Sequence, residues 1–135
     1  LEPFTSLRDG DEVRVHIRGG LLGHWSVWTR RAVEQLARIH AAVDSGTIDA
    51  DLLALNSKIT DCNRAMFDVE HDFAGCIPGC HEILRRQGLL DGTWCLNPDE
   101  VLSPGQAEEL DRVYAGYPEM NDDAFVAANL ERWLG

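Results

Sequence analysis

The sequence predicts a mostly α-helical fold with one or two short strands. Two observations support this: apolar residues recur at helical spacing in several segments, and one stretch near the N-terminus alternates strictly between apolar and polar residues. The chain has 135 residues, of which 44% are hydrophobic and 26% are charged, enough for one domain with one core. No apolar run approaches the roughly 20 residues that cross a bilayer, so we expect no membrane association.

The alternating stretch covers residues 12–18 and lies between a Gly10-Asp11 turn signal and Gly19-Gly20. A strand here places Val13, Val15 and Ile17 on one face and Arg14, His16 and Arg18 on the other. One strand cannot satisfy its own backbone hydrogen bonds, and nothing else in the sequence has a clear strand pattern. We therefore expect Val13 to Ile17 to pair with strands outside this chain or with a second copy of it.

Apolar periodicity and capping residues predict helices at residues 26–45, 49–67, 79–87, 103–114 and 121–134. Gly46 ends the first helix and Asp49 is suited to cap the second, so the short connection predicts antiparallel neighbours. The stretch Ser103-Pro104-Gly105-Gln106 combines an N-cap serine, a proline in the first turn and a glutamine at the capping-box position.

The chain is acidic, with a formal net charge of −11 at pH 7, and residues 97–135 hold nine acidic and two basic residues. This argues against nucleic-acid binding, because neutralising phosphates needs clustered Lys and Arg. The first residues show no signal-peptide pattern. We expect a cytoplasmic location and four reduced thiols, at Cys62, Cys76, Cys80 and Cys95.

Three stretches have a recognisable order and spacing: Ala41 to Gly46 with the helix after it, Phe73 to Leu90, and Val101 to Leu110. Over about residues 30–117 this order resembles the C-terminal region of the dihydrodipicolinate synthase / N-acetylneuraminate lyase family. The resemblance implies the C-terminal part of a (β/α)8 TIM barrel plus its C-terminal helical appendage. Residues 1–46 would then be the last strand or strands and helix of the barrel, and residues 47–135 the C-terminal helical region.

Enzymes of this family form a Schiff base between a lysine and a 2-oxo acid, usually pyruvate, and the groups that react lie N-terminal to the region seen here. The resemblance therefore implies a segment or subunit of an aldolase-type lyase that contributes pocket rim and oligomer contacts. It implies no catalytic residue, cofactor or metal of its own. Its partners would be the missing N-terminal barrel half or a separate chain supplying it, further copies in a homo-oligomer, and a small 2-oxo acid. The alternative is a non-catalytic helical interaction or assembly module.

The candidate substrate-binding residues are His16, Arg18, Gly19, Gly20 and His24. Arg18 would hold a carboxylate or phosphate, the glycines would allow close backbone approach, and His24 would stand in a pocket wall with its neighbouring tryptophans. The alternatives are a half-exposed strand, a plain turn, and tryptophans that pack in the core.

Lys58 is the only lysine, and its mid-helix position predicts an ordinary solvated side chain rather than a Schiff-base amine. A second set of residues has metal-ligand chemistry: His71, Cys76, Cys80 and His81. Zinc sites usually use tight C-x2-C pairs, and this spacing does not provide them. We expect no metal site.

Overall fold

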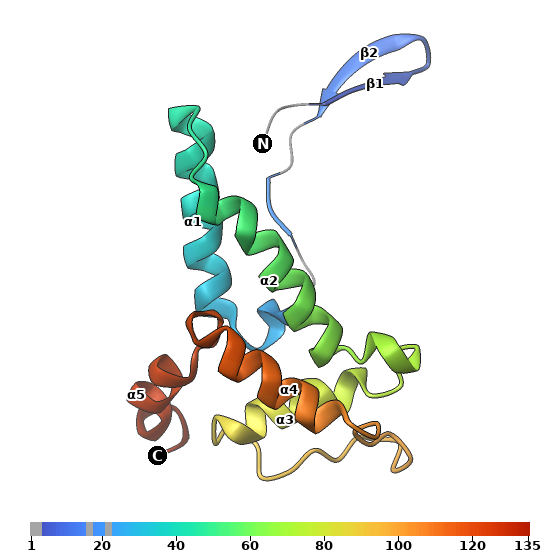
Figure 1. Cartoon of the computed structure of the whole chain (residues 1–135), viewed down its shortest axis with the longest axis vertical. Coiled ribbons are helices and arrows are strands. Elements are labelled where there is room, and N and C mark those ends of the chain that lie inside the picture. Colours follow the sequence, from blue (N-terminus) through green and yellow to red (C-terminus); the bar gives the residue numbers. More distant parts are fainter. Residues whose placement is uncertain (1–3, 16–17, 21–22) are drawn as a thin grey trace.

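The computed structural model describes residues 4–15, 18–20 and 23–135. In this part of the chain, a two-stranded hairpin precedes a group of helices (Figure 1). The strands are β1 (Phe4–Arg8) and β2 (Asp11–Val15), and the short 3-10 helices are η1 (His24–Ser26), η2 (Val69–His71) and η3 (Pro118–Met120). The α-helices are α1 (Thr29–Ser45), α2 (Ala50–Met66), α3 (Cys76–Arg86), α4 (Gln106–Gly116) and α5 (Asp123–Leu134).

The expected fold class, the C-terminal part of a TIM barrel, is wrong. Barrel strands pair in parallel, whereas β2 pairs antiparallel with β1 of the same chain, from Phe4 opposite Val15 to Arg8 opposite Asp11. These two strands form the sheet of the described residues, which otherwise fold as a small helical domain. The predicted boundary after residue 46 coincides with the left-handed turn at Gly46 between α1 and α2 and stays a prediction.

The expectation that the strand pairs outside this chain is also wrong for Val13 to Val15, and Ile17 lies outside the described residues. The strand pairs within the chain because of the two-residue loop Asp9-Gly10, whose φ angles are 54° and 90°. Positive φ at both loop positions defines the tight turn whose twist matches a hairpin. Aspartate followed by glycine is a strong hairpin signal, and this turn lets β2 pair with β1.

The core lies where α2, α3, α4 and η1 meet, below the α1–α2 connection in Figure 1. α2 turns one stripe inward at helical spacing, with Leu55, Cys62 and Met66 buried. The fully buried side chains from the rest of the described chain include Trp28, Ile83, Leu110, Val113 and Met120. An ion pair also joins α2 to α4: the Arg112 guanidinium donates to both carboxylate oxygens of Asp61, at 2.7 and 2.8 Å. This lowers the pKa of Asp61 to about 2.

α1 is joined to this core chiefly at its first turn, with further contacts from Gln35 to Met120 and from Arg38 to Asp51 of α2. The buried Asp122 carboxylate accepts hydrogen bonds from the backbone N–H groups of Arg30 at 2.8 Å and Arg31 at 3.0 Å. These amides have no partner inside the helix, so the carboxylate caps the N-terminus of α1. Beyond this point α1 rises away from the body, and none of its 17 residues is buried.

We predict that Asp122→Ala lowers the free energy of unfolding by roughly 2 kcal/mol, because it leaves two helix-terminal amides without an acceptor. Chemical denaturation monitored by circular dichroism measures this. Asp49→Ala is the matched control: Asp49 precedes α2 but makes no side-chain capping bond, so it should cost a few tenths of a kcal/mol. Equal losses in the two variants would contradict the assigned role of Asp122.

Candidate functional site

The turn between α2 and α3 is built around a buried carboxylate. Asp68 is 5% exposed and accepts hydrogen bonds from the Ser103 hydroxyl at 2.5 Å and the Gly75 N–H at 2.9 Å. The Nδ1 atom of His71 lies 2.6 Å from its other oxygen. The backbone has positive φ at Asp68, Asp72 and Phe73, which is uncommon for residues other than glycine. The carboxylate bonds hold the chain in this conformation.

Gln106 makes a second connection between the turn that precedes α3 and the segment that begins at Ser103. Its Oε1 accepts from the Ser103 N–H at 3.1 Å, and its Nε2 donates to the carbonyl oxygens of Gly75 at 2.9 Å and Met66 at 3.3 Å. A Cβ atom on Gly75 would lie 2.0 Å from Gln106 Oε1, so this approach requires glycine. We call Asp68, Gly75, Ser103 and Gln106 the Asp68 network.

Burial alone would raise the pKa of Asp68, but the hydrogen bonds from Ser103, His71 and the Gly75 amide outweigh burial and hold its pKa below the ordinary value. The carboxylate is therefore charged at neutral pH and fully used as an acceptor. Serine, histidine and aspartate also occur together in hydrolases, where histidine contacts the serine directly. Here Asp68 stands between Ser103 and His71, so the histidine is not positioned to take the serine proton. The arrangement is structural.

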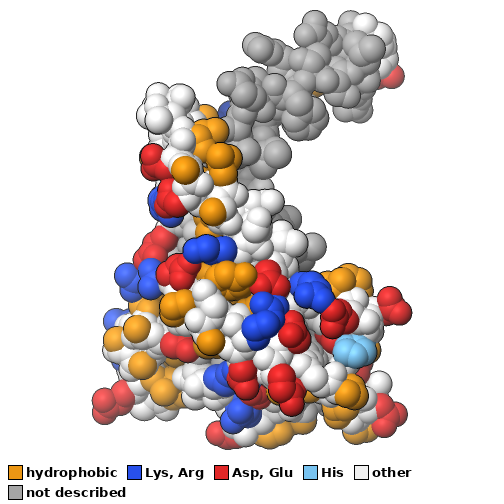
Figure 2. Space-filling view, in the orientation of Figure 1, with side chains coloured by type: hydrophobic (Ala, Val, Ile, Leu, Met, Phe, Trp, Pro, Cys, Tyr) orange, Lys and Arg blue, Asp and Glu red, His pale blue; other side chains and the backbone are white. Residues whose placement is uncertain are grey.

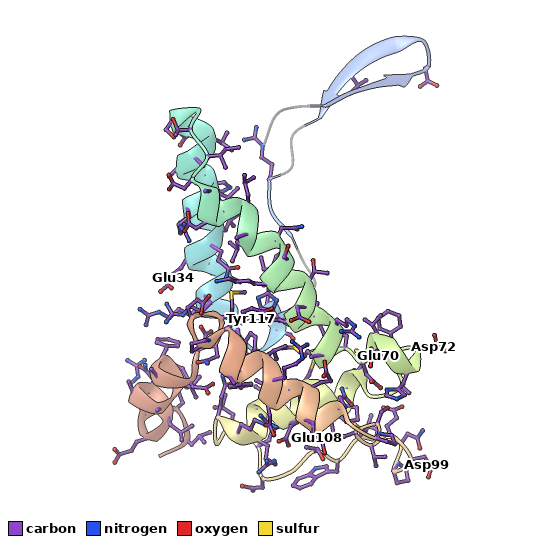
Figure 3. All side chains as sticks on the ribbon, viewed as in Figure 1. Glu34, Glu70, Asp72, Asp99, Glu108 and Tyr117 are labelled. Atoms are coloured by element: carbon purple, nitrogen blue, oxygen red, sulfur yellow. The ribbon has the colours of Figure 1, made fainter. Side chains whose placement is uncertain are left out.

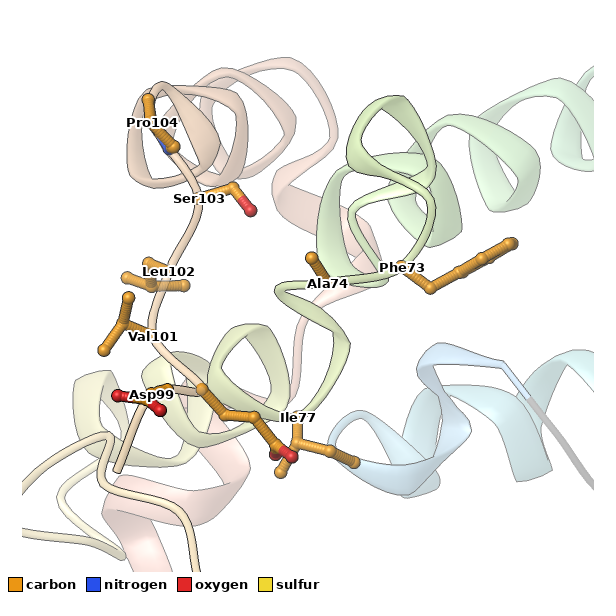
Figure 4. Close-up of a pocket in the computed structure, with 9 residues that line it drawn as sticks. Phe73, Ala74, Ile77, Asp99, Val101, Leu102, Ser103 and Pro104 are labelled. Carbon is orange, nitrogen blue, oxygen red and sulfur yellow. The ribbon is translucent and has the colours of Figure 1, made fainter. Parts of the chain in front are cut away.

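Two hollows flank the segment 99–104, which the Asp68 network holds against the start of α3. The smaller, about 230 Å³, is polar, and its lining includes Arg64, Asp68, His71 and Glu109. The larger, about 580 Å³, is the apolar groove (Figure 4). Its lining residues are Phe73, Ala74, Ile77, Asp99, Glu100, Val101, Leu102, Ser103 and Pro104.

Large apolar side chains are exposed in and near this groove. Phe73, Ile77 and Val101 line it and are 58%, 48% and 62% exposed. Trp94 and Leu96, in the preceding connection, are exposed as well. Exposed apolar side chains that gather in one region mark candidate interaction sites in soluble proteins.

The predicted substrate-binding residues do not line either hollow where they are described. His24 is fully buried in η1, and its backbone N–H and its Nδ1 lie 2.8 and 3.1 Å from Asn63 Oδ1. Burial lowers its pKa, so its ring is neutral at pH 7. Arg18, Gly19 and Gly20 are exposed before η1, and a Cβ on Gly20 would meet the Trp25 ring at 2.2 Å. His16 lies outside the described residues. Their substrate-binding role stays a prediction.

Lys58 lies in the middle of α2, and its ammonium donates to Glu119 at 2.5 Å. This hydrogen bond raises the pKa of Lys58, which disfavours the neutral amine that a Schiff base requires. Burial raises the pKa of the Cys62 thiol to about 12 and also raises the pKa values of Cys76 and Cys80. In the described part of the chain, no three His, Cys, Asp or Glu side chains are grouped to hold a metal ion.

No family model, no curated protein and no solved structure matches this chain. Across the described residues, none of the helices combines the length and apolar character of a transmembrane segment. The groove and the Asp68 network are therefore interpreted from their own geometry.

Sequence reasoning missed the Asp68 network and the apolar groove. The sequence held one signal of the Asp68 network: the capping-box pattern predicted that Gln106 reaches back toward Ser103, and Gln106 does accept a hydrogen bond from the Ser103 N–H. The Ser103 hydroxyl instead bonds to Asp68, 35 residues earlier, and a local pattern cannot show such a contact. The groove combines residues from two separate segments, neither of which has a motif.

We predict that Asp68→Asn lowers the free energy of unfolding by roughly 2–3 kcal/mol at pH 7, because buried donors lose a charged acceptor. The pKa of Asp68 is lowered by folding, so its contribution is present above the unfolded value of 3.8 and is lost as pH falls through the native value. The variant should therefore show a smaller acid-induced loss of stability than the wild type, measured by urea denaturation at several pH values.

Asp72→Asn is the control for this test. Asp72 is exposed, also has positive φ, and asparagine tolerates that conformation. Its stability should stay within about 0.5 kcal/mol of wild type. A neutral effect of Asp68→Asn would show that the network does not hold the turn.

Proposed function

We propose that this chain is a non-catalytic helical assembly module that self-associates through α1, α2 and their connection. The observation that carries the proposal is that α1, a helix of 17 residues, buries no residue of its own. In proteins most of the stability of a helix comes from tertiary packing of its amphipathic face. A second copy would supply the packing that α1 lacks.

The surface offered for this contact is apolar. Val33 and Val43 on α1, Ile48 in the connection and Leu53 on α2 are all exposed. Figure 2 shows apolar side chains gathered near the end of the molecule where α1 and α2 meet. Burying one such side chain contributes about 1.5–3 kcal/mol. Two helix pairs joined about a two-fold axis give a four-helix arrangement, a common way to bury such surfaces.

The charge distribution supports contact between identical copies. Residues 29–60 contain four acidic residues and four basic residues, so this part of an acidic chain is neutral. Residues 61–135 contain fifteen acidic and five basic residues, a net charge of −10. Two copies that meet through α1 and α2 keep their acidic bodies apart, which limits like-charge repulsion.

Action as part of an aldolase-type lyase stays a prediction that rests on the resemblance of residues 30–117. No described contact favours it, because Lys58 is engaged with Glu119 and the Ser103 hydroxyl with Asp68. A separate partner chain is the other form of assembly that the sequence suggested. A cytoplasmic location is part of the proposal and is supported by four thiols that form no disulfide among themselves.

We predict a wild-type native mass of twice the 15.0 kDa of one chain in sedimentation equilibrium at micromolar concentration. Ile48→Asp and Leu53→Asp should each weaken the dimer at least tenfold, because each places a charge in an apolar contact. Both residues are exposed in the single chain, so its fold should persist. Val101→Asp, equally exposed but far along the chain, is the control and should leave the mass unchanged.

A wild-type mass of one chain throughout this range would contradict self-association. A larger mass that depends on a different co-purifying chain would favour a separate partner instead.

We also predict that incubation with pyruvate and borohydride leaves the mass of the chain unchanged. The hydrogen bond to Glu119 raises the pKa of Lys58 and so disfavours the neutral amine that attacks the carbonyl. Intact-mass spectrometry detects the reduced adduct, and a Schiff-base aldolase treated in parallel is the positive control. A stoichiometric adduct on Lys58 would revive the lyase hypothesis.

A further inference from the structure

We propose that the apolar groove binds an extended segment of a partner protein in which apolar side chains alternate with lysine or arginine. This site is separate from the self-association surface and goes beyond the proposed function. Three properties of the groove support it: the apolar lining, the unpaired backbone along one wall, and the charge of its lining.

The lining matches apolar side chains. Phe73 and Ile77 come from the start of α3 and the turn before it, and Val101 and Leu102 come from the opposite wall. A volume of about 580 Å³ lies in the range of protein binding pockets. The Asp68 network joins the two walls through Asp68–Ser103 and Gln106–Gly75, so the groove is formed before the partner arrives. Preorganisation of this kind lowers the entropic cost of binding.

The backbone of one wall is available for pairing. In the described structure the N–H and C=O groups of Val101 and Leu102 make no backbone hydrogen bond, whereas the Glu100 N–H donates to the Asn97 carbonyl oxygen and the Ser103 N–H donates to Gln106 Oε1. Val101 is exposed and Leu102 is half-buried, as alternate residues of a strand are. Adjacent residues of an extended chain direct these groups to opposite edges, so a partner segment pairs by strand addition with one of the two residues, and its own alternate side chains enter the groove.

The charge of the groove selects the partner. Asp99 and Glu100 belong to the lining, which contains no basic residue. Figure 3 shows Asp72, Asp99 and Glu108 at the same end of the molecule, where Glu70 is paired with Arg64, and the net charge of residues 61–135 is −10. Lysine or arginine on the solvent side of the partner segment would meet these carboxylates, which favours basic over acidic sequences.

The test uses a fluorescein-labelled hexapeptide of alternating lysine and valine, and a counterpart with glutamate in place of lysine. Fluorescence anisotropy with the full chain should show the lysine peptide binding at least tenfold more tightly. Asp99→Lys should reduce that preference at least fivefold, and Val101→Asp should abolish binding. N-methylation of the central peptide amides should also weaken binding, because it blocks strand pairing.

Leu53→Asp is the matched control, since it lies on the self-association surface and should leave peptide affinity unchanged. Circular dichroism of each variant confirms that it is folded. The proposal is overturned if both peptides bind equally, if the lysine peptide does not bind, or if Val101→Asp and N-methylation leave its affinity unchanged. These outcomes are independent of the native mass, so either proposal can fail alone.

Discussion

The Asp122 carboxylate joins the beginning and the end of the helical domain. By accepting hydrogen bonds from the amides of Arg30 and Arg31, it fixes the start of α1 to residues more than 90 positions later. Arg31 strengthens the junction by donating to the Asn121 carbonyl oxygen at 3.2 Å. The junction holds α1 at one end, and along the rest of the helix no residue is fully buried, although Leu36 and Ile39 are half-buried. This geometry is the basis of the proposed self-association.

The domain therefore has two parts with different electrostatics. α1, α2 as far as residue 60 and their connection are neutral and expose apolar side chains, whereas the body is acidic and compact. Ion pairs connect side chains within the body: Asp61 pairs with Arg112, and Glu82 pairs with Arg85 and Arg86. At its outer end, Glu70 pairs with Arg64, whereas Asp72 and Asp99 form no ion pair with the described residues and leave that surface negative. One part is suited to contact its own copy, and the other to contact a basic partner.

Local patterns predicted the helices well and their arrangement poorly. The helix expected at 49–67 is α2 at Ala50–Met66, and the helix expected from residue 79 begins at Cys76, because Pro78 is tolerated in a first turn. The barrel assignment failed because an order of helices and turns is compatible with several folds. The fully buried position of His24 and the contact of Asp122 with α1 depend on residues distant in sequence. No periodicity or capping rule contains that information.

The central claim is that α1 is stabilised by a second copy of the chain. Hydrogen–deuterium exchange at two protein concentrations, one above and one well below the dissociation constant of the dimer, tests this most directly. We predict that amides of α1 beyond Arg31 are protected in the concentrated sample and exchange rapidly in the dilute one, while those of α2 beside the core and of α4 stay protected in both. Protection of α1 that is the same at both concentrations would contradict the account, because the helix would then be stable without a partner.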